Sequence, residues 1–178
     1  MTSLSKTANQ SAIDALFINN TTMDISASEV DTFLTNLLDS VLGGYGAIST
    51  VGASTLQELT TSFSKLTQFT ANGVSANCTP DHTNDQITIL VAGDYAFDIE
   101  ITGFGEGAGT YTCAPSVGGT ESTVYQDSHT TAGTEVFHLK RSGILTLAAN
   151  DILTVEMKAD ATLDFTMTSG VFRVKRWS

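Results

Sequence analysis

Residues 93–109, GDYAFDIEITGFGEGAG, join a run of strict alternation to a run of glycines. The first run alternates small or polar residues with apolar ones, which are Tyr95, Phe97, Ile99 and Ile101. Such alternation predicts a strand with one buried face. A phosphate-binding loop would place its glycines at the start of a helix and would usually add a lysine. Here Glu106 lies among the glycines, and another strand-like run, TYTCA, follows them. The glycines therefore predict a connection between two strands of a sandwich.

The period of two continues from about residue 67 to the C-terminus. Each run is short, rich in Val, Ile, Thr, Phe or Tyr, and bounded by Gly, Asn, Asp or Ser. The runs are QITILVAGDYAFDIEI, GTYTCAPSV, STVYQDS, TEVFHLKRSG, GILTLAA, DILTVEMKA, TLDFTMTSG and VFRVKRW. Strands at this spacing with no helices between them predict an antiparallel sandwich or barrel.

One helix is predicted upstream of the strands. Ser26 and Glu29 form a capping box, in which a hydroxyl and a carboxylate satisfy free N–H groups at the helix start. A stripe of apolar residues follows at helical spacing, and we call it the apolar stripe: Val30, Phe33, Leu34, Leu37, Leu38 and Val41. Gly43 and Gly44 end the helix. A helix of this length is marginal alone, so we expect the stripe to pack on a partner surface or on sister helices.

The chain is expected to have three parts. Residues 1–25 form a polar N-terminal arm, residues 26–66 a helical and linker region for attachment, and residues 67–178 the β-domain. Within the second part, GGYGAISTVGAST is predicted to be a glycine-rich linker. A short second helix is predicted for TLQELTTSFSKLTQF, whose apolar residues recur every three or four positions.

Composition excludes several classes of function. The chain of 178 residues carries 19 acidic and 8 basic residues, a net charge of −11, so nucleic-acid binding is not expected. No apolar run is long enough to span a membrane, and the first residues do not resemble a secretory signal, so folding in a cytoplasm is expected. Cys78 and Cys113 are too few for a zinc site. We expect both to be reduced and buried, with a disulfide as the alternative.

No catalytic residue, cofactor or metal is predicted. The histidines are His82, His129 and His138, and none lies in a pattern that suggests a triad with Ser or Cys. The stretch DHTND, residues 81–85, offers oxygen donors for Ca²⁺ but lacks the spacing of an EF-hand. Loops rich in Asp and Asn more often turn the chain, and we favour a turn here.

Three motifs in the C-terminal part resemble the jelly-roll domains of the tumour-necrosis-factor and complement-globular-head superfamily. These are a Gly-x-Tyr-x-Phe strand, a Leu-x-Leu-x-x-Gly-Asp-x-(Val/Leu)-x-Val hairpin and a closing strand with an aromatic residue. The matching residues are Gly93, Tyr95, Phe97, Leu145, Leu147, Asp151, Leu153, Val155 and Phe172. Asn150 stands where the superfamily usually has Gly, and asparagine also tolerates positive φ. The resemblance covers residues 67–178. The expected fold is mainly β, an N-terminal arm and helix followed by an antiparallel jelly-roll β-sandwich.

The N-terminal part resembles another group of proteins. ISASEVDTFLTNLLDSVLGGYGAIST is similar to the helix near the start of many tailed-phage virion proteins, although Asp31 replaces the usual Arg. Together the two resemblances imply a trimeric bacteriophage structural protein. Jelly rolls of this superfamily trimerise by packing aromatic and apolar strand faces around a threefold axis. The candidates for that seam, or equally for the core within one sandwich, are Tyr95, Phe97, Phe165 and Phe172.

The expected function is a non-enzymatic capsid cement or decoration protein. Its apolar stripe would bind the major capsid protein, and three arms on one trimer would act at high effective concentration. It would be made in the bacterial cytoplasm and lie on the capsid surface of the virion. The alternative is a tail or head fibre tip that binds host surface glycans, which predicts exposed aromatic residues such as Tyr111 or Tyr125. An enzyme, such as a polysaccharide depolymerase, is a third hypothesis that the short chain does not favour.

Overall fold

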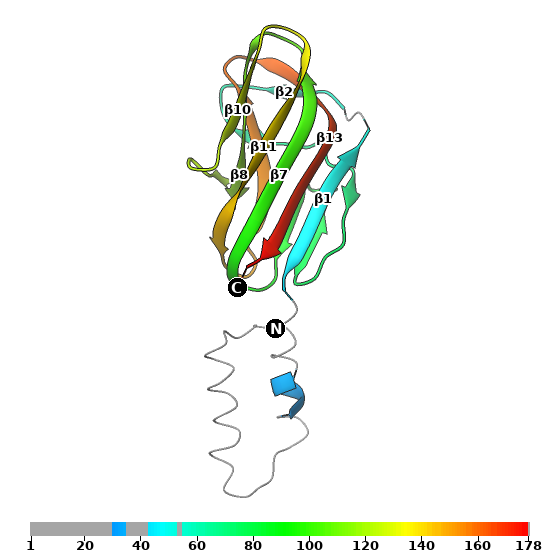
Figure 1. Cartoon of the computed structure of the whole chain (residues 1–178), viewed down its shortest axis with the longest axis vertical. Coiled ribbons are helices and arrows are strands. Elements are labelled where there is room, and N and C mark those ends of the chain that lie inside the picture. Colours follow the sequence, from blue (N-terminus) through cyan, green and yellow to red (C-terminus); the bar gives the residue numbers. More distant parts are fainter. Residues whose placement is uncertain (1–29, 35–42, 53–54, 178) are drawn as a thin grey trace, which may run out of the picture.

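The structure, a computed structural model, describes residues 30–34, 43–52 and 55–177 (Figure 1). Residues 30–34 are helical, and strands make up most of the remainder. The strands are β1 (Tyr45–Val51), β2 (Gln57–Leu59), β3 (Ser64–Lys65), β4 (Ala71–Asn72), β5 (Cys78–Asp81), β6 (Gln86–Ile89), β7 (Gly93–Gly105), β8 (Gly109–Val117), β9 (Thr120–Glu121), β10 (Asp127–Thr131), β11 (Glu135–Leu147), β12 (Ile152–Ala159) and β13 (Leu163–Arg176).

Two antiparallel sheets pack face to face. Sheet A has the strand order β11-β7-β13-β1-β4, and β2 also pairs with β13. Sheet B has the order β10-β8-β12-β6-β5, with β3 paired to β12 and β9 paired to β8. Strands distant in sequence are therefore neighbours, as in β1 with β13 and β8 with β12. The chain is thus a mainly β, antiparallel jelly-roll sandwich, which confirms the predicted fold class.

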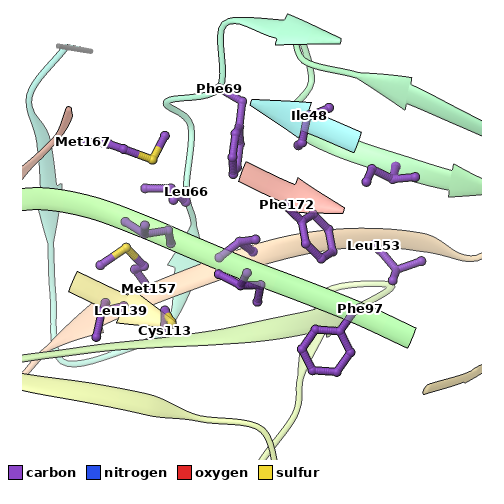
Figure 2. Close-up of a cluster of buried hydrophobic side chains, with 14 of the residues drawn as sticks. Ile48, Leu66, Phe69, Phe97, Cys113, Leu139, Leu153, Met157, Met167 and Phe172 are labelled. Carbon is purple, nitrogen blue, oxygen red and sulfur yellow. The ribbon is translucent and has the colours of Figure 1, made fainter. Parts of the chain in front are cut away.

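The core lies between the two sheets and follows the alternation along β7. Tyr95 and Ile99 are fully buried, while Phe97 and Ile101 are at most 2% exposed. Side chains from both sheets complete the core, including Cys113 of sheet B (Figure 2). Burying this many apolar side chains at about 1.5–3 kcal/mol each is the main stabilising contribution to the fold.

The glycines after the alternation have a packing role. A Cβ at Gly103 would lie 2.5 Å from the Phe165 ring, and one at Gly105 would lie 2.3 Å from the Tyr111 ring. Both distances are far below van der Waals contact, so aromatic rings occupy the space that a side chain would need. Gly103 and Gly105 end β7, and β8 begins at Gly109. A connection between two strands is confirmed, but Gly103 and Gly105 belong to β7 itself, where the packing of aromatic rings against them requires glycine.

The linker predicted for GGYGAISTVGAST is wrong. Seven of its residues form β1, which pairs with β13 over its whole length and buries Ile48. In this strand Gly46, Ile48 and Thr50 are buried, alternating with more exposed residues. Apolar alternation therefore exists here, but small side chains made it resemble a linker. The sandwich begins at residue 45, upstream of the residue 67 expected.

The second helix predicted for TLQELTTSFSKLTQF is also wrong, since this stretch holds β2 and β3. Leu59 and Leu66 are fully buried, whereas Leu56 is half exposed. The apolar residues therefore do not share one helical face. Threonine and serine, which are poor helix formers, fill much of the stretch. Pairing with β13 and β12 supplies the backbone hydrogen bonds instead.

The first strand starts and the last strand ends at the same end of the sandwich, which we call the base. Tyr45 at the start of β1 pairs with Lys175 near the end of β13. The Trp177 N–H donates to the Asp94 carbonyl at 2.7 Å, which fixes the last described residue beside the start of β7. Figure 1 shows that β1 starts at this base, beside the C-terminal end of β13.

Candidate functional site

The outward side of sheet A is the surface on which exposed apolar and paired charged side chains gather. We call it the sheet A face, formed by the outward residues of β11, β7, β13 and β1. Because neighbouring strands are in register, residues far apart in sequence form rows across this face. One such row is Ser142, Asp98, Arg173 and Ala47.

Large apolar side chains on this face are open to solvent. Their exposed fractions range from 42% for Tyr45 to 89% for Val51, with Ile144 at 49% and Val136 at 63%. Trp177, which continues the outward alternation of β13, is 75% exposed. Exposed apolar side chains that cluster on one face are typical of surfaces that bind another protein. The sheet A face is therefore the candidate interaction surface.

A charge cluster occupies the middle of the face. Arg173 Nη2 and Nε both donate to Asp98 Oδ2, at 2.6 and 2.9 Å, and Nη2 also lies 3.2 Å from Glu100 Oε1. Lys140 Nζ donates to the same Glu100 oxygen at 2.6 Å. Two acids and two bases thus pair across three strands, so the cluster carries no net charge.

The pairing shifts the titration of the cluster. The hydrogen bond from Lys140 holds the pKa of Glu100 below its ordinary value, with the charges of Lys140 and Arg173 adding to the effect. The pKa of Lys140 is raised by the same hydrogen bond, and Asp98 raises the pKa of Arg173. These shifts favour the ionised forms of Glu100, Lys140 and Arg173, so a covering partner would have to accommodate paired charges.

A hollow of about 390 Å³ lies on the base half of this face. Its lining is mostly apolar and includes Tyr45, Ala47, Val74 and Ala96. Val74 is 82% exposed, so part of the lining is apolar and open to water. Asp98, Arg173 and Lys175 also line it. The hollow is thus an apolar depression beside a cationic group.

The four aromatic candidates for seam or core all lie inside the sandwich. Tyr95, Phe165 and Phe172 are fully buried and Phe97 is 2% exposed in the single chain. Phe165 contacts Phe137, with ring centroids 5.6 Å apart. The structure therefore assigns these residues to the core, because their side chains point away from the sheet A face. The sequence did not identify that face, since its members are mostly the polar partners in each alternating strand.

The apolar stripe is described only in part. Val30 and Leu34 are 41% and 53% exposed, and Phe33 is partly buried. Leu37, Leu38, Val41 and the capping box lie outside the described residues, as does the arm at 1–25. The two exposed side chains are one helical turn apart and belong to the same stripe.

The cysteines are free and buried, as predicted. Desolvation by burial raises the pKa of Cys78 to about 11 and that of Cys113 to about 12. Thiols held protonated in this way are poor nucleophiles. The positions of these thiols therefore favour packing over chemistry.

His129 and His138 each contact a neighbouring strand. His129 stacks on Phe137 at 5.1 Å between centroids, and its Nε2 lies 3.7 Å from Glu135 Oε1. His138 Nδ1 lies 2.9 Å from the Thr102 hydroxyl across β11 and β7. Each contact is between neighbouring strands of the sandwich, and neither pairs a histidine with a Ser or Cys side chain.

The DHTND stretch forms a turn. Asp81 Oδ1 accepts from the backbone N–H groups of Thr83 and Asn84, and its Oδ2 accepts from the Asn84 amide. Asp85 is buried and accepts from the Phe69 N–H at 2.9 Å. Within the described ranges no three His, Cys, Asp or Glu side chains gather in a way that could hold a metal ion.

The two aromatic residues expected to be exposed in a glycan-binding tip differ in burial. Tyr111 is fully buried in β8, which contradicts the expectation for this residue. Tyr125 is partly buried, and its ring packs edge-on against Phe97 at 5.2 Å. The ring of Tyr125 therefore packs against the core instead of standing free on a loop.

Comparison with known proteins supports the fold. No family model and no curated protein matches the chain. The structure is similar to Eiger TNF from S. frugiperda, with a TM-score of 0.55 and 12% identity, over 76% of this chain and 94% of that one. It is also similar to murine APRIL, with a TM-score of 0.52 and 14% identity over 74% and 98% of the two chains. The globular domain of zebrafish complement 1qA matches with a TM-score of 0.51 and 14% identity over 76% and 98%.

These likenesses confirm the predicted resemblance to tumour-necrosis-factor and complement globular domains at the level of fold. Identities this low carry no residue roles from one chain to another. In the described residues, no helix has the length and apolar character that crossing a membrane requires.

Proposed function

We propose that the chain is a non-enzymatic, homotrimeric decoration protein of a phage head. The sandwich would form a knob on the capsid, and the N-terminal region would bind the major capsid protein. The observation that carries the proposal is the pair of exposed apolar side chains, Val30 and Leu34, in a segment joined to the base of the sandwich. The phage context comes from the resemblance of residues 25–50 to virion proteins.

Trimer formation is supported by the sheet A face. Its exposed apolar side chains would leave water on contact with another copy, at about 25 cal/mol per Å² of apolar area. The paired charges in its middle would fix the register of the contact, since mispaired like charges oppose association. The superfamily resemblance implies the same stoichiometry.

Oligomerisation is tested by sedimentation or light scattering, where three times the 18.8 kDa of one chain is expected. Ile144→Glu places a charge on the sheet A face and should yield folded monomers. Ile152→Glu is the matched control, because Ile152 is 40% exposed on the outward side of sheet B. A wild-type monomer at all concentrations, or a trimer unaffected by Ile144→Glu, would contradict this assignment.

Capsid attachment is tested with a chain lacking residues 1–42. The truncated protein should remain folded and trimeric but fail to bind heads that lack the decoration protein. Heads that carry the full chain should release their genome at a higher temperature than heads without it. Binding of the truncated protein to heads would reject the role of the N-terminal region. Immunogold labels at the tail, with few copies per virion, would favour the glycan-binding fibre tip instead.

A further inference from the structure

We infer that the hollow on the sheet A face is a seat for the apolar stripe of a neighbouring copy of this chain, used while no capsid is present. The inference rests on the proposed self-association, although it does not require a phage head. It assigns the hollow one occupant, the segment of residues 29–41 from a second copy.

The chemistry of the hollow matches that segment. The lining is mostly apolar, with Tyr45, Ala47, Val74 and Ala96 among its residues, and the volume has room for more than one aliphatic side chain. An amphipathic helix binds such a groove through side chains three and four positions apart. Val30, Phe33 and Leu34 have that spacing, and the next apolar residues of the stripe continue it.

Charge favours the same occupant. Acidic residues outnumber basic ones in the whole chain, yet the lining of the hollow holds two basic residues, Arg173 and Lys175, and one acidic residue, Asp98. Arg173 is paired with Asp98 and Glu100, whereas the Lys175 ammonium makes no ion pair among the described residues. The segment carries Glu29, Asp31 and Asp39 between its apolar residues. An acidic, apolar helix therefore complements the hollow better than a neutral one.

We assign the occupant to a neighbour because, in the described part of the chain, the hollow is not filled from within the same copy. None of the lining residues belongs to 30–34, and Val30 and Leu34 remain exposed. In a parallel assembly, with the bases of all copies at the same end, the start of β1 in one copy would lie near the base half of its neighbour's sheet A face.

Such a seat has a clear physical use. An apolar stripe open to water on a free protein promotes aggregation. A shallow, partly charged hollow holds the stripe only weakly, so a larger apolar surface on a capsid would displace it. The contact would thus keep the attachment segment out of water until it is needed.

Disulfide trapping in the full chain tests the seat. Leu34→Cys combined with Ala47→Cys should form cross-links between chains under mild oxidation, seen as dimers and trimers on non-reducing gels. The matched control combines Leu34→Cys with Thr130→Cys, an exposed residue on sheet B, and should cross-link at least about tenfold more slowly. Native Cys78 and Cys113 are buried and should not interfere. A cross-link within one chain, or equal rates in both pairs, would overturn the inference.

Two further variants test shape and charge separately. Ala96→Trp should fill the hollow and increase proteolytic cleavage in residues 29–41 about tenfold, as expected when an apolar contact is lost. Lys175→Glu should slow cross-linking of the Leu34→Cys/Ala47→Cys pair at low salt. Unchanged cleavage and unchanged cross-linking would reject the seat.

The same samples separate this inference from the proposed function. If light scattering shows a monomer, both the proposed trimeric function and the seat are rejected. If the protein is a trimer but the cross-link does not form, only the seat is rejected. Ala96→Trp should still bind heads, because the seat is used only in the free protein, whereas the chain without residues 1–42 should not.

Discussion

Gln68 is a buried side chain that replaces part of a strand. β2 pairs with Leu163–Phe165 of β13, and β1 pairs with β13 beyond its bulge at Met167 and Ser169. Between them Gln68 Nε2 donates to the Phe165 carbonyl at 3.1 Å, and its Oε1 accepts from the Met167 N–H at 2.6 Å. One amide thus satisfies the two backbone groups that no strand reaches.

Gln68→Leu should destabilise the sandwich by about 1–3 kcal/mol, because it leaves the buried Met167 N–H without an acceptor. Urea denaturation measures the change. Gln86→Leu, at a partly exposed position in β6, is the matched control and should change stability little. Equal midpoints for the two variants would show that the amide bridge contributes nothing.

Glu100 predicts how stability depends on pH. Its pKa in the folded chain is below its ordinary value of 4.5, chiefly because of the Lys140 hydrogen bond. A depressed folded pKa stabilises the protein above the unfolded pKa, and this stabilisation is lost as pH falls through the folded value. Between about pH 5 and pH 3, the melting temperature of the wild type should therefore fall further than that of Glu100→Gln. High salt should reduce the difference between the two proteins, since the charge cluster is exposed. Equal falls in the melting temperatures of the two proteins over this pH range would contradict the prediction.

At the scale of elements, β1 is the first part of the chain that the sandwich needs. It closes one side of β13 with seven paired residues and places Ile48 in the core. Its N-terminal end adjoins Gly43 and Gly44, so the segment upstream can be removed without breaking the ladder.

Two deletions should therefore behave differently. Loss of residues 1–42 should leave the melting temperature of the sandwich unchanged, whereas loss of residues 1–52 should lower it by at least about 5 °C. Ile48→Ala in the full chain gives a folded comparison, expected to cost about 2–5 kcal/mol. Circular dichroism melts provide the measurement. A stable chain without β1 would place the start of the domain downstream, as the sequence suggested.

The molecule as a whole has one core shared by both sheets. Cys78 in β5 and Cys113 in β8 belong to that core together with side chains of sheet A. Neither thiol can meet a reagent unless the sheets separate, so their reactivity reports opening of the entire sandwich.

Alkylation at pH 8 should be at least about a thousandfold slower in the native protein than in denaturant, because the thiols are both buried and protonated. Mass spectrometry should find chains labelled at neither or both cysteines, as expected for a single cooperative opening. Selective labelling of Cys78 would instead show that β5 opens separately from β8.

The sequence alone determined the fold class, most strands after residue 67 and the burial of one side of each. Alternation is a local pattern, so Tyr95, Phe97 and their neighbours could be placed inward without knowing any partner. Asn150 in the predicted tight turn has φ of 73°, consistent with its replacing glycine there. These features depend on residues close together in the chain.

Only the tertiary structure decided what each surface does. Arg173 lies next to Asp98, and Ala47 next to Arg173, because β7, β13 and β1 are adjacent in sheet A, and residues separated by dozens of positions set that order. The roles of β1 and of the glycines at 103 and 105 depend on the same packing. Pairing between distant strands brings these residues together, and no local pattern in the sequence encodes which strands will be neighbours.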